Sequence, residues 1–234
     1  MQLFFNPNIS NNDKEFSFDK EESRHIVKVL RKKVGDIIHI TNGKGWLFEA
    51  ELILADLKHC TVTLSNISRK EPRDYKLHLA VAPTKMNDRF EWFLEKVTEI
   101  GIDEITPIIC DNSERKVIKQ ERFEKIIQSA MKQSLQCYLP KLNPVVSFKD
   151  LIAQNIDGDK FIAHCEETDR KSLKSQVNTN SSTLILIGPE GDFSVKEITM
   201  ALDAHFIPVT LGKNRLRTET AAIAACHSVA LINE

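Results

Sequence analysis

One charge-free run of aliphatic and β-branched residues, ended by a turn rich in glycine and proline, constrains the fold of this chain most. The run covers residues 183–187 and predicts a strand that is buried on both faces. The turn Gly-Pro-Glu-Gly at residues 188–191 ends the strand, and Asp192 or Ser194 can cap the helix that follows. This order is typical of an open α/β sheet, in which ligands bind at the carboxyl ends of the strands.

The same pattern returns further along the chain. Residues 207–211 predict a short strand that Gly212 ends, and residues 214–220 lead into an alanine-rich helix. Because both glycine turns follow strands of one sheet, we expect them to face one pocket. Glycine at these places lets a flat ligand approach the backbone, whose N–H and C=O groups can read an adenine edge. A Gly-Pro-Glu-Gly sequence taken alone is more often only a turn.

Strands and helices alternate throughout the second part of the chain. Strand patterns cover residues 77–82, 104–110 and 160–164, and helical patterns cover residues 88–100 and 121–137. Such alternation predicts a parallel sheet that is covered by helices on both faces, which is an α/β fold.

The last helical pattern, residues 221–232, is apolar on most of its sides. Its small side chains indicate close packing against a neighbour, which is either the chain's own core or a second subunit. We expect His227 on this helix to be a buried histidine of the core. Thr218 or Thr220 is the expected N-cap of the helix, and Glu219 suits its positive end.

The first part of the chain has the pattern of a small β-barrel. Its predicted strands are residues 3–5, 15–18, 37–41, 46–54 and 60–67. Asn42 and Gly43 give the strongest hairpin signal. A polar stretch with a proline, residues 69–74, precedes the change of pattern, so we place a domain boundary there and predict domains at residues 1–72 and 73–234.

A single helix interrupts these strands and carries a basic stripe. Asp19 can cap it, and Ile26, Val29 and Leu30 form its predicted apolar face. A stripe of positive charge on a compact β module can follow a phosphate backbone, although a solvated helix face is the simpler interpretation of a charge run. The stripe consists of Arg24, Lys28 and Arg31, and Lys32 and Lys33 extend it.

Composition limits the partners and the compartment of the chain. Its 234 residues carry a formal net charge of -1, so nucleic-acid contacts must come from a local patch. The five cysteines show no CxxC or Cys/His metal spacing, which suggests reduced thiols and no structural metal. The sequence shows no signal peptide and no apolar run of membrane length. We therefore expect a cytoplasmic protein without a membrane partner.

Several common catalytic signatures are missing from the sequence, including GxGxxG, GxxxxGK[ST], GxSxG and HExxH. Arg215 and Arg217 are predicted in a loop beside the pocket, where a positive charge has no evident structural use. His164, Cys165 and Glu166 follow a predicted strand, so they either line the same pocket or form only a sheet edge.

At these residues the sequence resembles the RsmE family, the 16S ribosomal RNA uridine N3-methyltransferases of the SPOUT superfamily. The resemblance extends over nearly the full chain and includes Arg217 in the last of its motifs. The motifs are Arg24-His25 through Val29-Leu30-Arg31, Glu95-Lys96 with Glu99-Ile100-Gly101, Gln133-Ser134 with Pro140, Gly188-Pro-Glu-Gly191, and Leu216-Arg-Thr-Glu-Thr-Ala221.

The resemblance implies a PUA-like RNA-binding barrel followed by a SPOUT α/β domain whose carboxyl end forms a trefoil knot. It also implies a homodimer that acts on 16S rRNA or the small ribosomal subunit. Three loops would hold S-adenosylmethionine, at residues 164–166, 187–191 and 211–217. The cofactor-binding residues are then His164, Ile187, Gly188, Glu190, Gly191, Leu211, Gly212, Leu216 and Arg217.

Methyl transfer to N3 of a uridine requires removal of the N3 proton or stabilisation of the resulting anion. We expect Arg217 to stabilise the anion, Glu219 to be a candidate base, and Arg215 to contact RNA. A methyltransferase of another RNA such as tRNA, or a non-catalytic RNA-binding factor, would be an alternative. Family members usually differ from this chain at four positions, which are Gln136 (Arg), Asp192 (Gly), Asn214 (Arg) and Arg215 (aliphatic).

Overall fold

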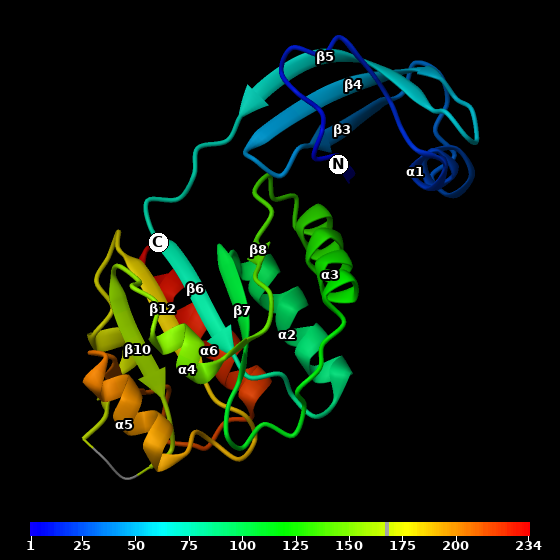
Figure 1. Cartoon of the computed structure of the whole chain (residues 1–234). Coiled ribbons are helices and arrows are strands. Elements are labelled where there is room, and N and C mark those ends of the chain that lie inside the picture. The colour runs from blue at the N-terminus through cyan, green and yellow to red at the C-terminus, as the bar shows by residue number, and fades with distance from the viewer. Residues whose placement is uncertain (167–168) are drawn as a thin grey trace. The chain divides into compact units, whose positions relative to one another are not determined.

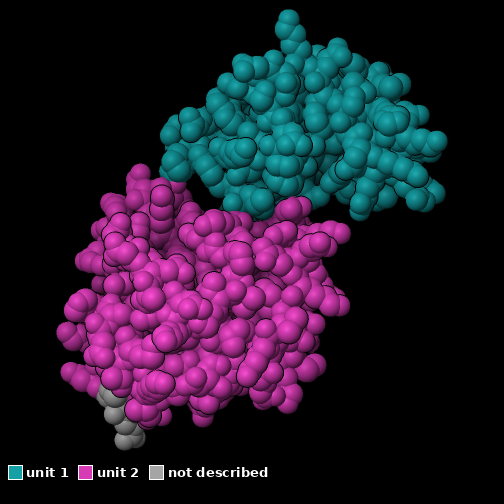
Figure 2. Space-filling model, viewed as in Figure 1, with its two compact units in different colours: residues 1–72, 131–139 teal, residues 73–130, 140–234 magenta. Residues whose placement is uncertain are grey.

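The computed structural model describes residues 1–166 and 169–234. The chain forms two compact units, coloured separately in Figure 2. Unit 1 contains Met1–Pro72 and Met131–Leu139, and unit 2 contains Arg73–Ala130 and Pro140–Glu234. The segment 131–139 thus groups with the first part of the chain. The assignment of an RNA-binding domain to residues 1–72 and a methyltransferase domain to residues 73–234 stays a prediction.

Unit 1 is built on a five-stranded sheet in the order β1-β3-β4-β5-β2 (Figure 1). Alternate residues of the long central strand, such as Phe48 and Leu52, are fully buried, as the alternating pattern predicts. Asn42 and Gly43 lie in the connection of an antiparallel hairpin, which confirms that signal. The strands are β1 (Leu3–Phe5), β2 (Glu15–Ser17), β3 (Ile37–Thr41), β4 (Trp46–Leu54) and β5 (Thr61–Arg69).

The helix of unit 1 begins as predicted but does not continue as one α-helix. Asp19 is its N-cap and accepts a hydrogen bond from the Glu22 amide. After α1 (Lys20–Arg24) the backbone widens into the π-helix η1 (His25–Val29), with an i→i+5 hydrogen bond from Leu30 N to His25 O of 3.0 Å. The predicted apolar face is therefore wrong at Val29, which is 66% exposed, whereas Ile26 is buried.

Unit 2 is built on an eight-stranded parallel sheet in the order β11-β13-β10-β12-β6-β7-β8, with β9 also paired to β7. The predicted buried strand is confirmed as β12, where residues 183–187 are all buried. The strands are β6 (Lys76–Val81), β7 (Glu104–Ile109), β8 (Lys141–Leu142), β9 (Val146–Ser147), β10 (Asp159–Ala163), β11 (Lys171–Ser172), β12 (Ser182–Ile187) and β13 (Ile207–Thr210).

Helices cover both faces of this sheet, as predicted. In Figure 1, α4 lies in front of the strands and α6 behind them. Phe148 of α4 and Ile198 of α5 pack with Leu184 and Leu186 of β12 in one apolar cluster, while α6 packs on β6, β12 and α2. The helices are α2 (Asn87–Ile100), α3 (Gln120–Gln133), α4 (Phe148–Ile152), the 3-10 helix η2 (Leu173–Ser175), α5 (Val195–Asp203) and α6 (Thr218–Ile232).

Two helix ends differ from the sequence prediction. The predicted helix 121–137 stops at Gln133, because Leu135 has a φ of 58° that no α-helix accommodates. Neither Thr218 nor Thr220 is the N-cap of α6. That position is Arg217, without a side-chain hydrogen bond to the helix, and Thr218 Oγ1 instead donates to the Gly188 carbonyl at 3.0 Å.

The expectation of a buried His227 is also wrong, because this side chain is exposed on α6, one turn before the exposed Leu231. Ser194 rather than Asp192 caps α5, in a capping box with Glu197. Among the described residues, no helix has the length and apolar character needed to cross a membrane.

Candidate functional site

Two adjoining cavities lie where strands β10, β12 and β13 end, at the carboxyl edge of the parallel sheet. We call them the Leu211 cavity, of about 370 Å³, and the Gly188 cavity, of about 300 Å³. They share lining residues in the loops after β10 and before α6, among them Cys165 and Leu216. The two glycine turns therefore meet at one continuous site, as the sequence pattern predicts.

Most residues that sequence analysis assigns to this site line one of the cavities. Two of the predicted residues, Gly191 and Glu219, line neither cavity. The Leu211 cavity contains His164, Leu211 and Gly212, the Gly188 cavity contains Ile187, Gly188, Glu190 and Arg217, and both contain Arg215 and Leu216.

His164 is a buried side chain whose ring nitrogens have no partner among the residues that the structure describes. Its side chain lies in the wall of the Leu211 cavity, it is only 4% exposed, and neither ring nitrogen has a hydrogen-bond partner among the described residues. Burial lowers the pKa of the imidazole, so the ring is neutral at pH 7. A neutral, unpartnered imidazole can donate one hydrogen bond and accept another, which suits a polar ligand.

Glu190 connects the glycine turn to the loop after β6. One of its carboxylate oxygens accepts a hydrogen bond of 2.9 Å from the Lys85 amide, while the Lys85 ammonium pairs with Glu114 at 2.8 Å. Sequence analysis did not identify Lys85, because its contact with Glu190 joins positions far apart in the chain. The side chain of Glu190 thus helps to hold the turn in place beside the Gly188 cavity.

Asp192 joins the glycine turn to the loop after β10. Its carboxylate accepts hydrogen bonds from the Cys165 amide at 2.7 Å and from the Phe193 amide at 2.8 Å. Its φ of 63° lies in the left-handed region, which Asp tolerates better than most residues. A glycine at this position would adopt the same backbone conformation but could not make the connection to Cys165.

We predict that removal of the Asp192 carboxylate loosens the loop after β10. A hydrogen bond to a charged group is worth about 1.5–3 kcal/mol, so amide exchange at residues 163–166 should rise on the order of 10-fold or more in Asp192→Gly. Asp192→Asn should show an intermediate increase, since its amide oxygen can accept from only one of the two N–H groups. Hydrogen-exchange mass spectrometry measures this, with the strands of unit 1 as the unchanged reference. Wild-type protection in the glycine variant would contradict the prediction.

Arg217 and Glu219 differ in their surroundings, although both lie at the start of α6. Arg217 is exposed at the Gly188 cavity and forms no ion pair within residues 1–166 and 169–234. The Glu219 side chain is 7% exposed, and its Oε1 lies 3.9 Å from Arg89 Nε of α2. This geometry favours an ion-pair role for Glu219, and its assignment as a base stays a prediction.

The sequence matches two family models that correspond to the two parts of the chain. A model of the RNA methyltransferase domain matches residues 70–230, and a model of the RNA methyltransferase PUA domain matches residues 18–65. The chain is 31% identical to ribosomal RNA small subunit methyltransferase E of Bacillus subtilis, over 94% of this chain and 91% of that protein. The chain belongs to the small subunit methyltransferase E family. This confirms the resemblance on which the sequence prediction rests.

Two further proteins that are similar to this chain support the same assignment. Ribosomal RNA small subunit methyltransferase E of Buchnera aphidicola (strain APS) is 32% identical, over 90% of this chain and 86% of that protein. The crystal structure of a probable rRNA-methyltransferase from Porphyromonas gingivalis has a TM-score of 0.92 at 39% identity, and covers 100% of this chain and 98% of that one.

A methyltransferase E structure with bound cofactor is also similar to this chain. The Neisseria gonorrhoeae enzyme bound to S-adenosyl methionine has a TM-score of 0.83 at 25% identity, and covers 100% of this chain and 98% of that one. The PUA-like unit followed by a parallel α/β unit, predicted from the sequence, is thus confirmed as the fold of the methyltransferase E family.

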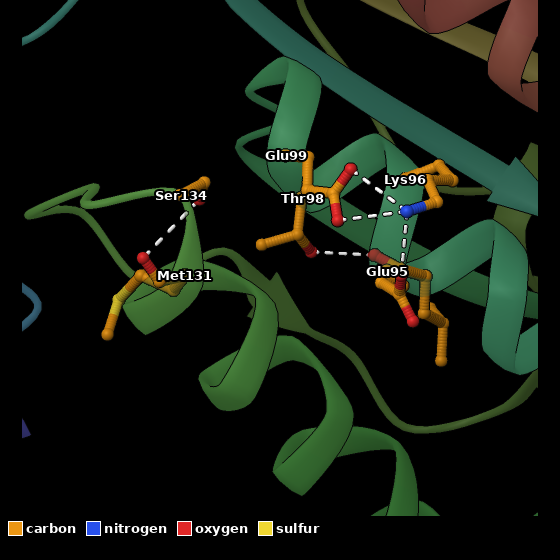
Figure 3. Close-up of polar contacts among 7 residues, drawn as sticks. Glu95, Lys96, Thr98, Glu99, Met131 and Ser134 are labelled. Carbon is orange, nitrogen blue, oxygen red and sulfur yellow. Dashed lines mark hydrogen bonds and ion pairs between the residues drawn. The ribbon is translucent and has the colours of Figure 1, made fainter.

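One methyltransferase E motif forms an ion-pair cluster on α2 rather than part of either cavity. Lys96 points toward the carboxylates of Glu95 and Glu99 (Figure 3), with Nζ–Oε1 distances of 2.7 and 3.0 Å. Separately, Ser134 Oγ in unit 1 donates to the Met131 carbonyl at 3.4 Å.

The predicted RNA-binding residues of unit 1 lie on two kinds of backbone. Arg24 and Lys28 are exposed on α1 and η1, whereas Arg31 has a φ of 56° and lies beyond the helix. Lys33 is exposed and Lys32 is half-buried. The expectation of one stripe along a single helix is therefore wrong beyond Lys28. Within the described part of the chain, no group of three or more His, Cys, Asp or Glu side chains could hold a metal.

Proposed function

We propose that this chain transfers a methyl group from S-adenosylmethionine to N3 of a uridine in 16S ribosomal RNA. The observation that carries the proposal is the continuous site formed by the loops at residues 164–166, 187–191 and 211–217. These are the loops at which the family resemblance predicts the cofactor, and the similar Neisseria gonorrhoeae enzyme has S-adenosyl methionine bound.

The residues at this site fit the proposed cofactor. His164 offers a buried imidazole without a partner in the described part of the chain, and Gly212 has open space where a side chain would stand, so a flat ligand can approach the backbone there. Glu190, Leu211 and Leu216 would complete the binding wall. When bound, the cofactor supplies an electrophilic methyl group on a sulfonium, and the protein contributes position and electrostatics.

The protein's own task is to stabilise the uridine after loss of its N3 proton. We assign this to Arg217, whose guanidinium is exposed at the Gly188 cavity without an ion-pair partner among the described residues. A fixed positive charge favours the anion that forms before attack on the methyl group. Glu219 beside Arg89 would support the start of α6. The proton acceptor would then be a group that lines the Gly188 cavity or a group of the RNA itself.

We further propose that the basic residues of unit 1 bind phosphates of the RNA, and that Arg215 does so at the cavity. The triple variant Arg24→Ala, Lys28→Ala, Arg31→Ala should bind RNA more weakly. Its salt slope, the steepness with which the logarithm of the binding constant falls with the logarithm of salt concentration, should be about 2–3 lower, since each lost phosphate contact removes about 0.7–0.9 from that slope. Filter binding over a salt series measures the slope, and calorimetry should show unchanged S-adenosylmethionine affinity. A slope equal to that of wild type would show that these residues make no phosphate contacts and form only a solvated surface.

A homodimer, a knotted carboxyl-terminal path and a cytoplasmic location complete the proposal. Two features of α6 support the homodimer. The helix consists largely of small apolar residues, and it exposes Leu231 next to the exposed His227. The reduced cysteines that the sequence predicts agree with a cytoplasmic location.

The test of the proposed activity compares RNA substrates directly. Purified protein with labelled S-adenosylmethionine should methylate unmodified 16S rRNA or small ribosomal subunits and leave tRNA unlabelled. Labelled tRNA alone would establish the alternative substrate. Absence of both S-adenosylmethionine binding and transfer would favour a non-catalytic RNA-binding factor.

A further inference from the structure

The loop between β7 and α3 contains a run of basic residues to which sequence analysis assigned no function. Arg115, Lys116 and Lys119 lie within five positions of one another, with Lys116 and Lys119 exposed and Arg115 half-buried. Val117 between them is 79% exposed. None of the three basic side chains has an ion-pair or hydrogen-bond partner in the described part of the chain. Their charges are therefore available to a partner.

The amino end of this loop is fastened to the glycine turn of the site. Asn112 Nδ2 donates to the carbonyl oxygens of Gly191 and Asp192, both at 3.1 Å. Ser194 Oγ donates to Asp111 Oδ2 at 2.6 Å, and the Asp111 amide donates to Glu197 at 2.9 Å. The run of basic residues thus starts at a fixed place beside the turn that lines the Gly188 cavity.

The acidic residue next to the basic run is already neutralised. Glu114 pairs with the Lys85 ammonium at 2.8 Å, and the Lys85 amide is bound to Glu190 of the glycine turn. Asp111 accepts a hydrogen bond from Ser194 at the amino end of the loop, so the part that follows Glu114 presents three positive charges without an ion-pair partner among the described residues, on a chain whose formal net charge is -1. An isolated small anion would need converging donors, whereas separate exposed cations along a loop suit the successive phosphates of a nucleic-acid strand.

We propose that Arg115, Lys116 and Lys119 bind phosphates of the RNA strand that carries the target uridine and so position it at the Gly188 cavity. This inference rests on the proposed function, since it concerns how the same site receives its substrate. It adds a second RNA-contacting element, in unit 2, to the basic residues expected in unit 1. The contact is electrostatic, so charge rather than side-chain identity should decide its strength.

The test compares three full-length variants with wild type. The first replaces Arg115, Lys116 and Lys119 by Ala, and the second keeps their charge as Arg115→Lys, Lys116→Arg and Lys119→Arg. The third is a control with an equal loss of charge elsewhere on unit 2, at the exposed residues Lys76, Lys149 and Lys174. Each protein is tested with in-vitro-transcribed 16S rRNA for binding over a salt series and for the KM and kcat of methyl transfer.

The alanine variant should have a salt slope about 2–3 below that of wild type, at 0.7–0.9 for each phosphate contact. A fourfold rise in salt should then weaken wild-type binding about 20–40-fold more than variant binding. The KM for RNA should rise, S-adenosylmethionine affinity should stay unchanged, and the charge-preserving variant and the control should resemble wild type.

Two results would overturn the inference. One is an alanine variant whose salt slope and KM for RNA equal those of wild type. The other is an equal fall in salt slope and an equal rise in KM in the alanine variant and the control, which would show a general effect of charge. Failure of the proposed function is a separate result, because it would appear as absence of methyl transfer by the wild-type protein itself.

Discussion

Arg217→Ala should lose on the order of 10²-fold or more in turnover, the scale of deleting one electrostatic stabiliser of a transition state. Its fold should be nearly unaffected, with a melting temperature within about 2 °C of wild type, because exposed residues without partners contribute little to stability. The structure supports this expectation, since Arg217 is exposed at the Gly188 cavity and makes no ion pair with the described residues. Single-turnover kinetics and calorimetric melting measure the two quantities.

The variant Arg217→Lys is the matched control for this prediction. A lysine keeps the charge but lacks the planar fork of the guanidinium, so it should recover only part of the lost turnover. Near-normal turnover of the alanine variant would remove Arg217 from catalysis. A large loss of melting temperature would instead show that Arg217 is a structural residue.

Gly212→Val should raise the Kd for S-adenosylmethionine about 10-fold or more, a loss of about 1.4 kcal/mol of binding free energy, because the valine side chain would occupy space through which the ligand approaches the backbone. Gly212 has a φ of 152° and nothing within 4 Å of the place where a Cβ would stand, so the new side chain would enter the open Leu211 cavity. Isothermal titration calorimetry measures the Kd.

Gly35→Val is the control for backbone strain, because Gly35 in unit 1 also has a positive φ, of 90°, and open space around its missing Cβ. It should melt at a lower temperature and bind the cofactor normally. Gly188 is a less direct test of cofactor approach, because a Cβ there would lie 3.1 Å from the buried Phe193 ring and disturb the core. Normal cofactor binding by Gly212→Val would place the ligand elsewhere.

The sequence predicts the parts of this structure that depend on local pattern. The alternating residues of β4, the uncharged run of β12 and the glycine turn at residues 188–191 each have a period or a backbone requirement that is visible in a few positions. The place where the two glycine turns meet follows from the general rule for parallel sheets.

Other features carry no recognisable sequence pattern, either because the backbone departs locally from α-helical geometry or because the contact joins distant positions. The π-helical turn leaves Val29 exposed, although an α-helical period predicts it on the apolar face. Glu219 has the sequence context of a catalytic carboxylate, yet Arg89 on another helix lies beside it. The hydrogen bond from the Cys165 amide to the Asp192 carboxylate joins two loops that lie far apart in the sequence, and no sequence motif indicates it.

The most direct test of the account is to map methylated uridines in small-subunit ribosomal RNA from cells with the chain and from cells lacking it. The account predicts that one N3-methyluridine disappears on deletion, returns with the wild-type chain, and is not restored by Arg217→Ala. Mass spectrometry of RNA fragments identifies both the position and the methylated atom. An identical pattern of N3-methyluridine in both kinds of cell would contradict the proposed function.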